Sequence, residues 1–126
     1  MKTLAIIIMA LTVSGCATVQ NWVPSFWDDN QSRIIVDARL LIEQIDCDQP
    51  QPAQVLRVDQ ELRRFQLYSQ AKGTLQKDVL RVIEPMKTST EEWVKRGEGS
   101  KTYCEIKKKL LTQQADRASS VILGRW

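Results

Sequence analysis

Residues 101–124 read KTYCEIKKKLLTQQADRASSVILG and carry the clearest helical pattern in the chain. Its small and apolar residues are separated by seven, four, three and four positions: Cys104, Leu111, Ala115, Ala118 and Ile122. At helical spacing these residues fall within about 60° of one another around the axis. Gly124 follows, at a place where helices commonly end. The stretch therefore predicts a long helix with one apolar face that must pack against other elements.

Three upstream segments carry the same periodicity. The first helix is expected to begin near Asp28, which can cap it, and to end before Pro50. The second is expected over residues 53–71. The third is expected to reach about residue 96 as a kinked helix, because Trp93 stays in phase across Pro85. The alternative is a break at Pro85, with a new helix capped within residues 88–92. The three apolar faces are Ile34, Ala38, Leu41 and Ile45; Val55, Val58, Leu62 and Phe65; and Leu75, Val79, Val82 and Met86.

Four helical segments with short connections predict an all-α fold, a small up-down-up-down four-helix bundle over residues 30–126. The low content of glycine (5) and proline (4) agrees with this prediction. In this topology the end of the first helix and the start of the last lie at the same end of the bundle. Cys47 and Cys104 occupy those two places.

The first sixteen residues have the features of an export signal. Lys2 supplies a positive charge, and residues 4–13 (LAIIIMALTV) form an apolar core that is too short to span a bilayer as a helix. The following Val13-Ser14-Gly15-Cys16 resembles the lipobox of bacterial lipoproteins. This resemblance covers residues 1–16 only, and it implies a cleaved signal peptide (1–15) and a lipidated Cys16. Ala17 is similar to the outer-membrane default in that family. An ordinary secreted protein is the alternative.

With Cys16 assigned to lipid, Cys47 and Cys104 remain as an even pair in an oxidising compartment. A disulfide between them closes a loop of roughly 57 residues. The chain contains no histidine, so a zinc site lacks its usual ligands and a catalytic cysteine lacks its usual base. We therefore predict a structural disulfide, no metal and no cofactor.

Two groups of apolar residues are candidates for contact with a partner or with the membrane. Residues 16–29 form a tether that holds Trp22, Phe26 and Trp27. These rings either cover one end of the core or lie at the membrane interface. Val36 and Leu40 lie on the far side of the first helix from its main apolar face. A helix that is apolar on two sides is either central in its domain or docked against another protein.

Charge and motifs restrict the function. The balance of 18 Lys+Arg against 15 Asp+Glu gives no electrostatic basis for binding nucleic acid. Without histidine, a nucleophile elbow or a phosphate-binding loop, we predict no enzymatic activity. The expected function is that of an outer-membrane lipoprotein facing the periplasm, an adaptor, scaffold or inhibitor that binds an envelope protein. The alternatives are a carrier of a lipid or small apolar ligand and, by analogy, a phage-encoded lipoprotein for lysis or receptor blocking.

Overall fold

The computed structural model of the chain describes residues 28–73 and 76–124, which form helices and contain no strand. The helices are α3 (Asp29–Glu43), α4 (Gln51–Lys72), α5 (Lys77–Arg96) and α6 (Lys101–Leu123). The prediction of an all-helical domain with four helices is confirmed. The expected signal peptide, Cys16 and the aromatic side chains of Trp22, Phe26 and Trp27 lie outside the described residues.

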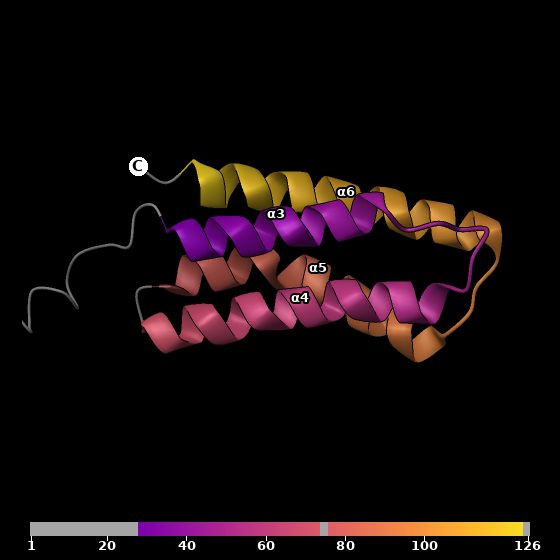
Figure 1. Cartoon of the computed structure of the whole chain (residues 1–126), viewed down its shortest axis with the longest axis horizontal. Helices are drawn as coiled ribbons and strands as arrows, with labels where there is room; N and C mark the ends of the chain where they lie inside the picture. Colours follow the sequence, from indigo (N-terminus) through magenta and orange to yellow (C-terminus); the bar gives the residue numbers. More distant parts are fainter. Residues whose placement is uncertain (1–27, 74–75, 125–126) are drawn as a thin grey trace, which may run out of the picture.

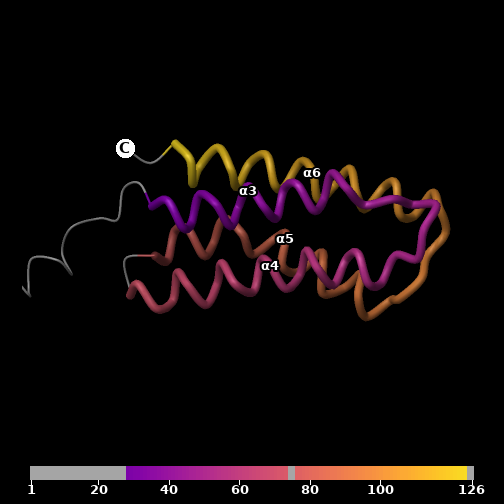
Figure 2. The backbone as a smooth tube through the Cα atoms, in the orientation of Figure 1, coloured from indigo at the N-terminus to yellow at the C-terminus, as the bar shows by residue number. Residues whose placement is uncertain are grey.

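Each helix packs against two neighbours. The contacting pairs are α3 with α4, α4 with α5, α5 with α6, and α3 with α6. Figure 1 shows the connections α3–α4 and α5–α6 at one end of the molecule. The end of α4 and the start of α5 lie at the other end, near the end of α6, as the backbone tube in Figure 2 also shows. All four helices therefore contribute one face to a common core.

Local sequence explains where the helices begin and end. Asp28 caps α3, because its Oδ1 accepts a hydrogen bond from the backbone N–H of Gln31 at 2.9 Å. Ser100 caps α6 in the same way, and its Oγ accepts from the backbone N–H of Tyr103 at 3.1 Å. α4 and α5 are followed by Gly73 (φ 110°) and Gly97 (φ 77°). Positive φ favours glycine, so these two residues stop their helices.

The core contains the apolar faces of all four helices. Its fully buried large side chains include Phe65, Trp93, Leu62 and Leu111, at a relative exposure of 1% or less. Ile45 is also buried, although α3 has already ended at Glu43. The hydrophobic faces predicted for α4 and α6 are confirmed, since every residue named for them is buried.

The predicted face of α5 is partly wrong. Val79, Met86 and Trp93 are buried as expected, but Val82 is half-buried and Ile83 is completely buried in its place. Between Met86 and Trp93 the buried line passes through a polar residue, Thr90, whose hydroxyl donates to Asp59 Oδ1 on α4 at 2.8 Å. Val82 and Ile83 lie three and four positions after Val79, so both fit helical spacing and the sequence did not distinguish them. Leu75 lies outside the described residues.

A disulfide joins Cys47, in the α3–α4 connection, to Cys104, in the first turn of α6. Their Cα atoms are 5.7 Å apart, and Cys104 is completely buried. Near this bond the Lys108 Nζ donates to the backbone carbonyl of Ile45 at 2.8 Å. The predicted disulfide is confirmed, and it links α6 to the chain between α3 and α4.

Candidate interaction surfaces

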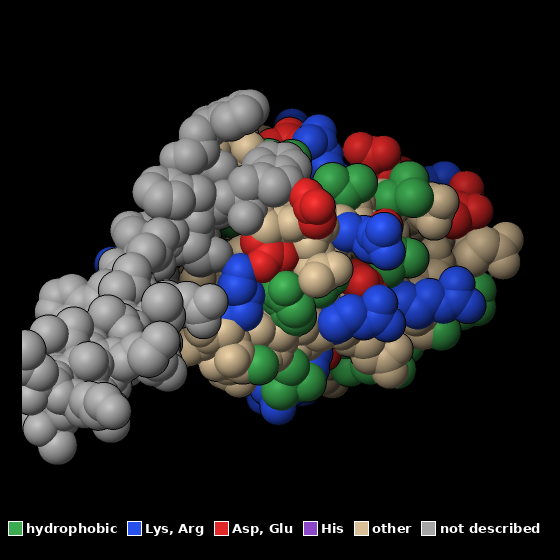
Figure 3. Space-filling model, turned by 60° about the vertical axis from the view of Figure 1, so that its left-hand side comes forward, with side chains coloured by type: hydrophobic (Ala, Val, Ile, Leu, Met, Phe, Trp, Pro, Cys, Tyr) green, Lys and Arg blue, Asp and Glu red, His purple; other side chains and the backbone are tan. Residues whose placement is uncertain are grey.

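Apolar side chains remain exposed among the charged residues of the bundle surface. Figure 3 shows one face, on which apolar side chains lie between Lys, Arg, Asp and Glu side chains. The large apolar residues that are exposed are Val36, Leu40, Leu56, Leu67, Ile106, Leu110 and Val121. Isolated exposed apolar residues are common, so those that lie close together or beside a groove carry more information.

The outer face of α3 holds the two predicted contact residues. Val36 is 48% exposed and Leu40 is 49% exposed, and four positions separate them, so they are neighbours along one side of the helix. The opposite side, with Ile35, Ala38 and Ile42, is completely buried. α3 is therefore apolar on two sides, one in the core and one on the surface.

Ion pairs border this surface. The guanidinium of Arg39, between the two apolar residues in the sequence, lies 2.7 Å from Asp116 Oδ1 on α6 and 3.7 Å from Glu43 Oε1. All three side chains are about half-exposed, so these pairs contribute little to stability. They hold charged groups beside Val36 and Leu40, which gives the apolar pair a polar border. We call Val36, Leu40 and Arg39 the α3 surface.

A polar cluster fixes the point at which residues 16–27 would join the bundle. The Tyr68 hydroxyl on α4 donates to Asp28 Oδ2 at 3.1 Å, and Lys72 forms an ion pair with the same oxygen. Asn30 Nδ2 in turn donates to the Tyr68 hydroxyl at 3.1 Å. Partial burial alone would raise the pKa of Asp28, but the hydrogen bonds from Lys72, Gln31 and Tyr68 outweigh it, so this pKa lies below its ordinary value of 3.8.

A buried glutamine lies near that same end of the bundle. Gln31 is 1% exposed, and its side-chain N–H groups donate to Ser69 Oγ at 3.0 Å and to Gln76 Oε1 at 2.7 Å. The network links α3 to the end of α4 and to the residue before α5. Buried amides require such partners, because an unpaired one is costly. Gln31 therefore sets the register among three segments.

A second buried glutamine lies near the disulfide end. Gln51 Oε1 accepts from the indole N–H of Trp93 and from the backbone N–H of Gly99, both at 3.2 Å, and its Nε2 donates to the Gly99 carbonyl at 3.0 Å. Its backbone N–H donates to Glu98 Oε2 at 2.9 Å, which caps α4 from the α5–α6 connection. This residue ties the start of α4 to the chain that follows α5.

Lys87 is a largely buried cation between α4 and α5. Its Nζ lies 2.7 Å from Asp59 Oδ1 and 2.8 Å from Glu91 Oε1. Desolvation alone would lower the pKa of Lys87, but the two carboxylates raise it above the ordinary value of 10.5. The cation thus stays charged and paired, which makes it a structural link.

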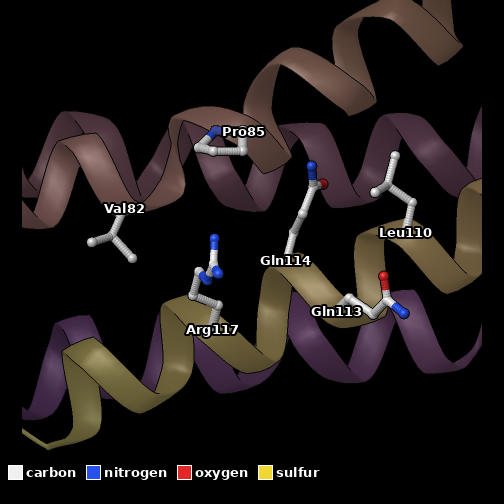
Figure 4. Close-up of a pocket in the computed structure, with 6 residues that line it drawn as sticks. All are labelled: Val82, Pro85, Leu110, Gln113, Gln114 and Arg117. Atoms are coloured by element: carbon white, nitrogen blue, oxygen red, sulfur yellow. The ribbon is translucent and has the colours of Figure 1, made fainter.

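A groove runs between α5 and α6, with a volume of about 370 Å³. Figure 4 shows its lining side chains and the change in direction of α5 beside Pro85, through which the helix continues. The residues that line it are Val82, Pro85, Leu110, Gln113, Gln114 and Arg117. Gln114 Oε1 is buried and has no hydrogen-bond partner among the described residues. Sequence analysis did not predict this groove.

The described residues contain no group of three or more His, Cys, Asp or Glu side chains that could hold a metal ion. Three carboxylates that have neighbouring acidic residues serve local structure: Asp28 caps α3, Asp46 Oδ1 accepts from the backbone N–H of Asp48, and Glu91 pairs with Lys87. No helix in the described part of the chain combines the length and apolar character needed to cross a membrane.

No protein-family model matches the chain, and the searches of curated proteins and of solved structures found no match either.

Proposed function

We propose that this chain is an outer-membrane lipoprotein that holds a helical domain in the periplasm and binds an envelope protein without catalysing a reaction. The proposal includes a cleaved signal peptide, lipid on Cys16 and an up-down-up-down order of the four helices. The positions of the connections in Figure 1 support that order. The lipobox-like Val13-Ser14-Gly15-Cys16 supports the anchor.

The α3 surface is the observation that carries the interaction function. Fully burying a valine or leucine side chain stabilises a complex by about 1.5–3 kcal/mol, so covering two half-exposed ones contributes about half of that for each. The border of Arg39, Glu43 and Asp116 supplies paired charges around this apolar centre. An apolar centre with a polar rim is the usual composition of a protein interface.

The centre of the bundle supports this function over that of a carrier. Phe65, Met86 and Trp93 are buried to 1% exposure or less and occupy the core with the apolar faces of all four helices. A carrier needs room for its ligand between the helices. The groove between α5 and α6 lies at the bundle surface, since Pro85 and Leu110 on its walls are exposed.

The tether would position the domain relative to the membrane. The segment 16–27 can extend to about 40 Å at roughly 3.3 Å per residue. It would join the bundle at Asp28, which Tyr68 and Lys72 hold against α4. Leu40 lies about 18 Å further along α3 at a rise of 1.5 Å per residue, so a partner that contacts the α3 surface would lie within about 60 Å of the outer membrane. Trp22, Phe26 and Trp27 are proposed to contact the membrane or the partner from this tether.

Site-specific crosslinking in cells tests the α3 surface. A photoreactive amino acid at Leu40 of the full, lipidated chain should crosslink to one envelope protein. The same group at Leu67, which is 51% exposed on α4, is the matched control and should not. Adding Val36→Asp should remove the crosslink at position 40 while the helical circular dichroism stays unchanged. Equal crosslinking at both positions, or a crosslink that survives Val36→Asp, would contradict the proposed surface.

Fractionation tests the anchor separately. Cys16→Ser should leave the protein unprocessed or soluble, whereas Cys47→Ser should still be retained by the membrane. A Cys16→Ser protein that only detergent extracts would refute lipidation at this residue and would leave the result for the α3 surface standing.

A further inference from the structure

The groove between α5 and α6 combines apolar walls with polar groups at defined places. Val82 and Pro85 come from α5, and Leu110, which is 37% exposed, comes from α6. Figure 4 shows the side chains of Gln114 and Arg117 rising from α6 between these apolar residues. Its volume of about 370 Å³ lies within the range of sites that hold small ligands or short peptide segments.

Gln114 places a carboxamide beside the groove that can turn to meet a hydrogen-bonding partner. Its Oε1 is buried without a donor among the described residues, and leaving such a group unpaired costs about 1–3 kcal/mol. If the amide is turned around, the same place holds an N–H₂ group that needs an acceptor. A peptide group offers both a donor and an acceptor, whereas an acyl chain offers neither.

Arg117 gives the groove a charge. Its guanidinium is exposed and forms no ion pair among the described residues, although Asp116, the preceding residue, is paired with Arg39. An arginine of this kind favours a carboxylate, which it can bind through two parallel hydrogen bonds. The other lining residues, Val82, Pro85, Leu110, Gln113 and Gln114, carry no charge.

Pro85 explains why the groove lies at this position. Proline has no backbone N–H, so it cannot donate the helical hydrogen bond to the carbonyl of Arg81, and its ring bends the helix. The bend in α5 beside Pro85 is visible in Figure 4. At a straight helix pair, side chains of the two helices would interdigitate and fill this space.

We propose that this groove binds an extended segment of a partner protein in which an aliphatic side chain lies next to an aspartate or glutamate. The aliphatic side chain packs on Val82, Pro85 and Leu110, a main-chain amide of the segment pairs with Gln114, and the carboxylate pairs with Arg117. This is a second contact, on α5 and α6, and it depends neither on the membrane anchor nor on the α3 surface.

Selection from a random peptide library displayed on phage tests the proposal. The bait is the full, lipidated chain in detergent micelles. The unmodified protein should enrich peptides that carry Asp or Glu next to Leu, Ile or Val. Arg117→Glu should reverse the preference to Lys or Arg, because the charge at the rim is reversed. Arg117→Ala should remove the preference for either charge.

Arg63→Glu on α4 is the matched control, because Arg63 is exposed, forms no ion pair among the described residues and gives the same change in net charge. It should leave the acidic preference intact. Leu110→Asp should lower the recovery of the selected peptides about tenfold, the equivalent of one lost aliphatic contact. Circular dichroism of each variant confirms that the helices are retained.

Three results would overturn the proposal. The first is that no peptide is enriched. The second is that apolar peptides are enriched without a preference for charge, which would assign the groove to apolar binding alone. The third is that Arg117→Glu and Arg63→Glu behave alike, which would place the recognition elsewhere on the protein. None of these results bears on the crosslink at Leu40, so the two surfaces succeed or fail separately.

Discussion

Loss of the Cys47–Cys104 disulfide should strongly destabilise the domain without removing its helices. The bond joins residues 57 positions apart, and a crosslink that closes a loop of this size restricts the unfolded chain. The chain-entropy estimate for such a loop is about 4 kcal/mol at 25 °C. For a domain of about 100 residues, a loss of this size lowers Tm by on the order of 20 °C. The native contacts of α3 and α6 are unchanged by the loss.

The measurement compares Cys47→Ala with the intact protein, both in a Cys16→Ser background so that neither carries lipid. Cys47 is the better position to change, because it is half-buried whereas Cys104 is completely buried in the core. Urea unfolding followed by circular dichroism gives the free energy of unfolding and the m-value. The m-value should rise, because the unfolded chain without the crosslink exposes more surface. Samples are kept under reducing conditions for the variant only, to prevent mixed disulfides.

A matched control separates the crosslink from the side chain. The intact Cys16→Ser protein, reduced while unfolded and refolded in reductant, keeps both sulfur atoms and loses only the bond. Its free energy of unfolding should be within about 1 kcal/mol of that of Cys47→Ala, since the alanine removes little buried surface. If the free energies of unfolding of Cys47→Ala and of the reduced protein are both within about 1 kcal/mol of that of the oxidised protein, the entropy reasoning fails. The unfolded chain would then already keep the segments around positions 47 and 104 close together without the bond.

Two further predictions concern polar side chains that hold the helices together. Gln51→Ala should lower the free energy of unfolding in urea by about 2–3 kcal/mol, because it leaves the Trp93 indole N–H and the Gly99 backbone N–H unpaired. The control Gln54→Ala should lower it by less than about 1 kcal/mol, because the hydrogen bonds of Gln54 are exposed. Equal losses for the two variants would contradict the role of Gln51. Asp28→Asn should be less stable than the unmodified protein at neutral pH. Because the folded pKa of Asp28 is below 3.8, its carboxylate stabilises the fold above that pH and loses this effect as the pH falls through the folded pKa. The difference between the two proteins in thermal unfolding should therefore shrink on acidification, and a difference that does not change with pH would refute the reasoning.

Sequence periodicity was enough to predict the helices, because an apolar face repeats every three to four residues whatever lies opposite it. The faces of α4 and α6 were predicted residue by residue for this reason. The helix cap at Asp28 could also be predicted from the sequence, since it depends on the residue type at a helix start. The disulfide could be predicted because the chain has a pair of cysteines and no histidine. On α5 the sequence predicted Val82 where the structure buries Ile83, because positions three and four after Val79 both fit a helical face and only packing against the other helices selects between them.

Tertiary structure alone decided which polar residues became internal links. Gln31, Gln51 and Lys87 look like ordinary surface residues in the sequence, and each is buried because its partners come from a different part of the chain. The groove likewise depends on two helices, since Pro85 bends α5 and Leu110 and Arg117 on α6 then line the space. Residue type and spacing thus determined the helices and the crosslink, whereas the internal polar contacts and the groove required two or more segments to meet in space.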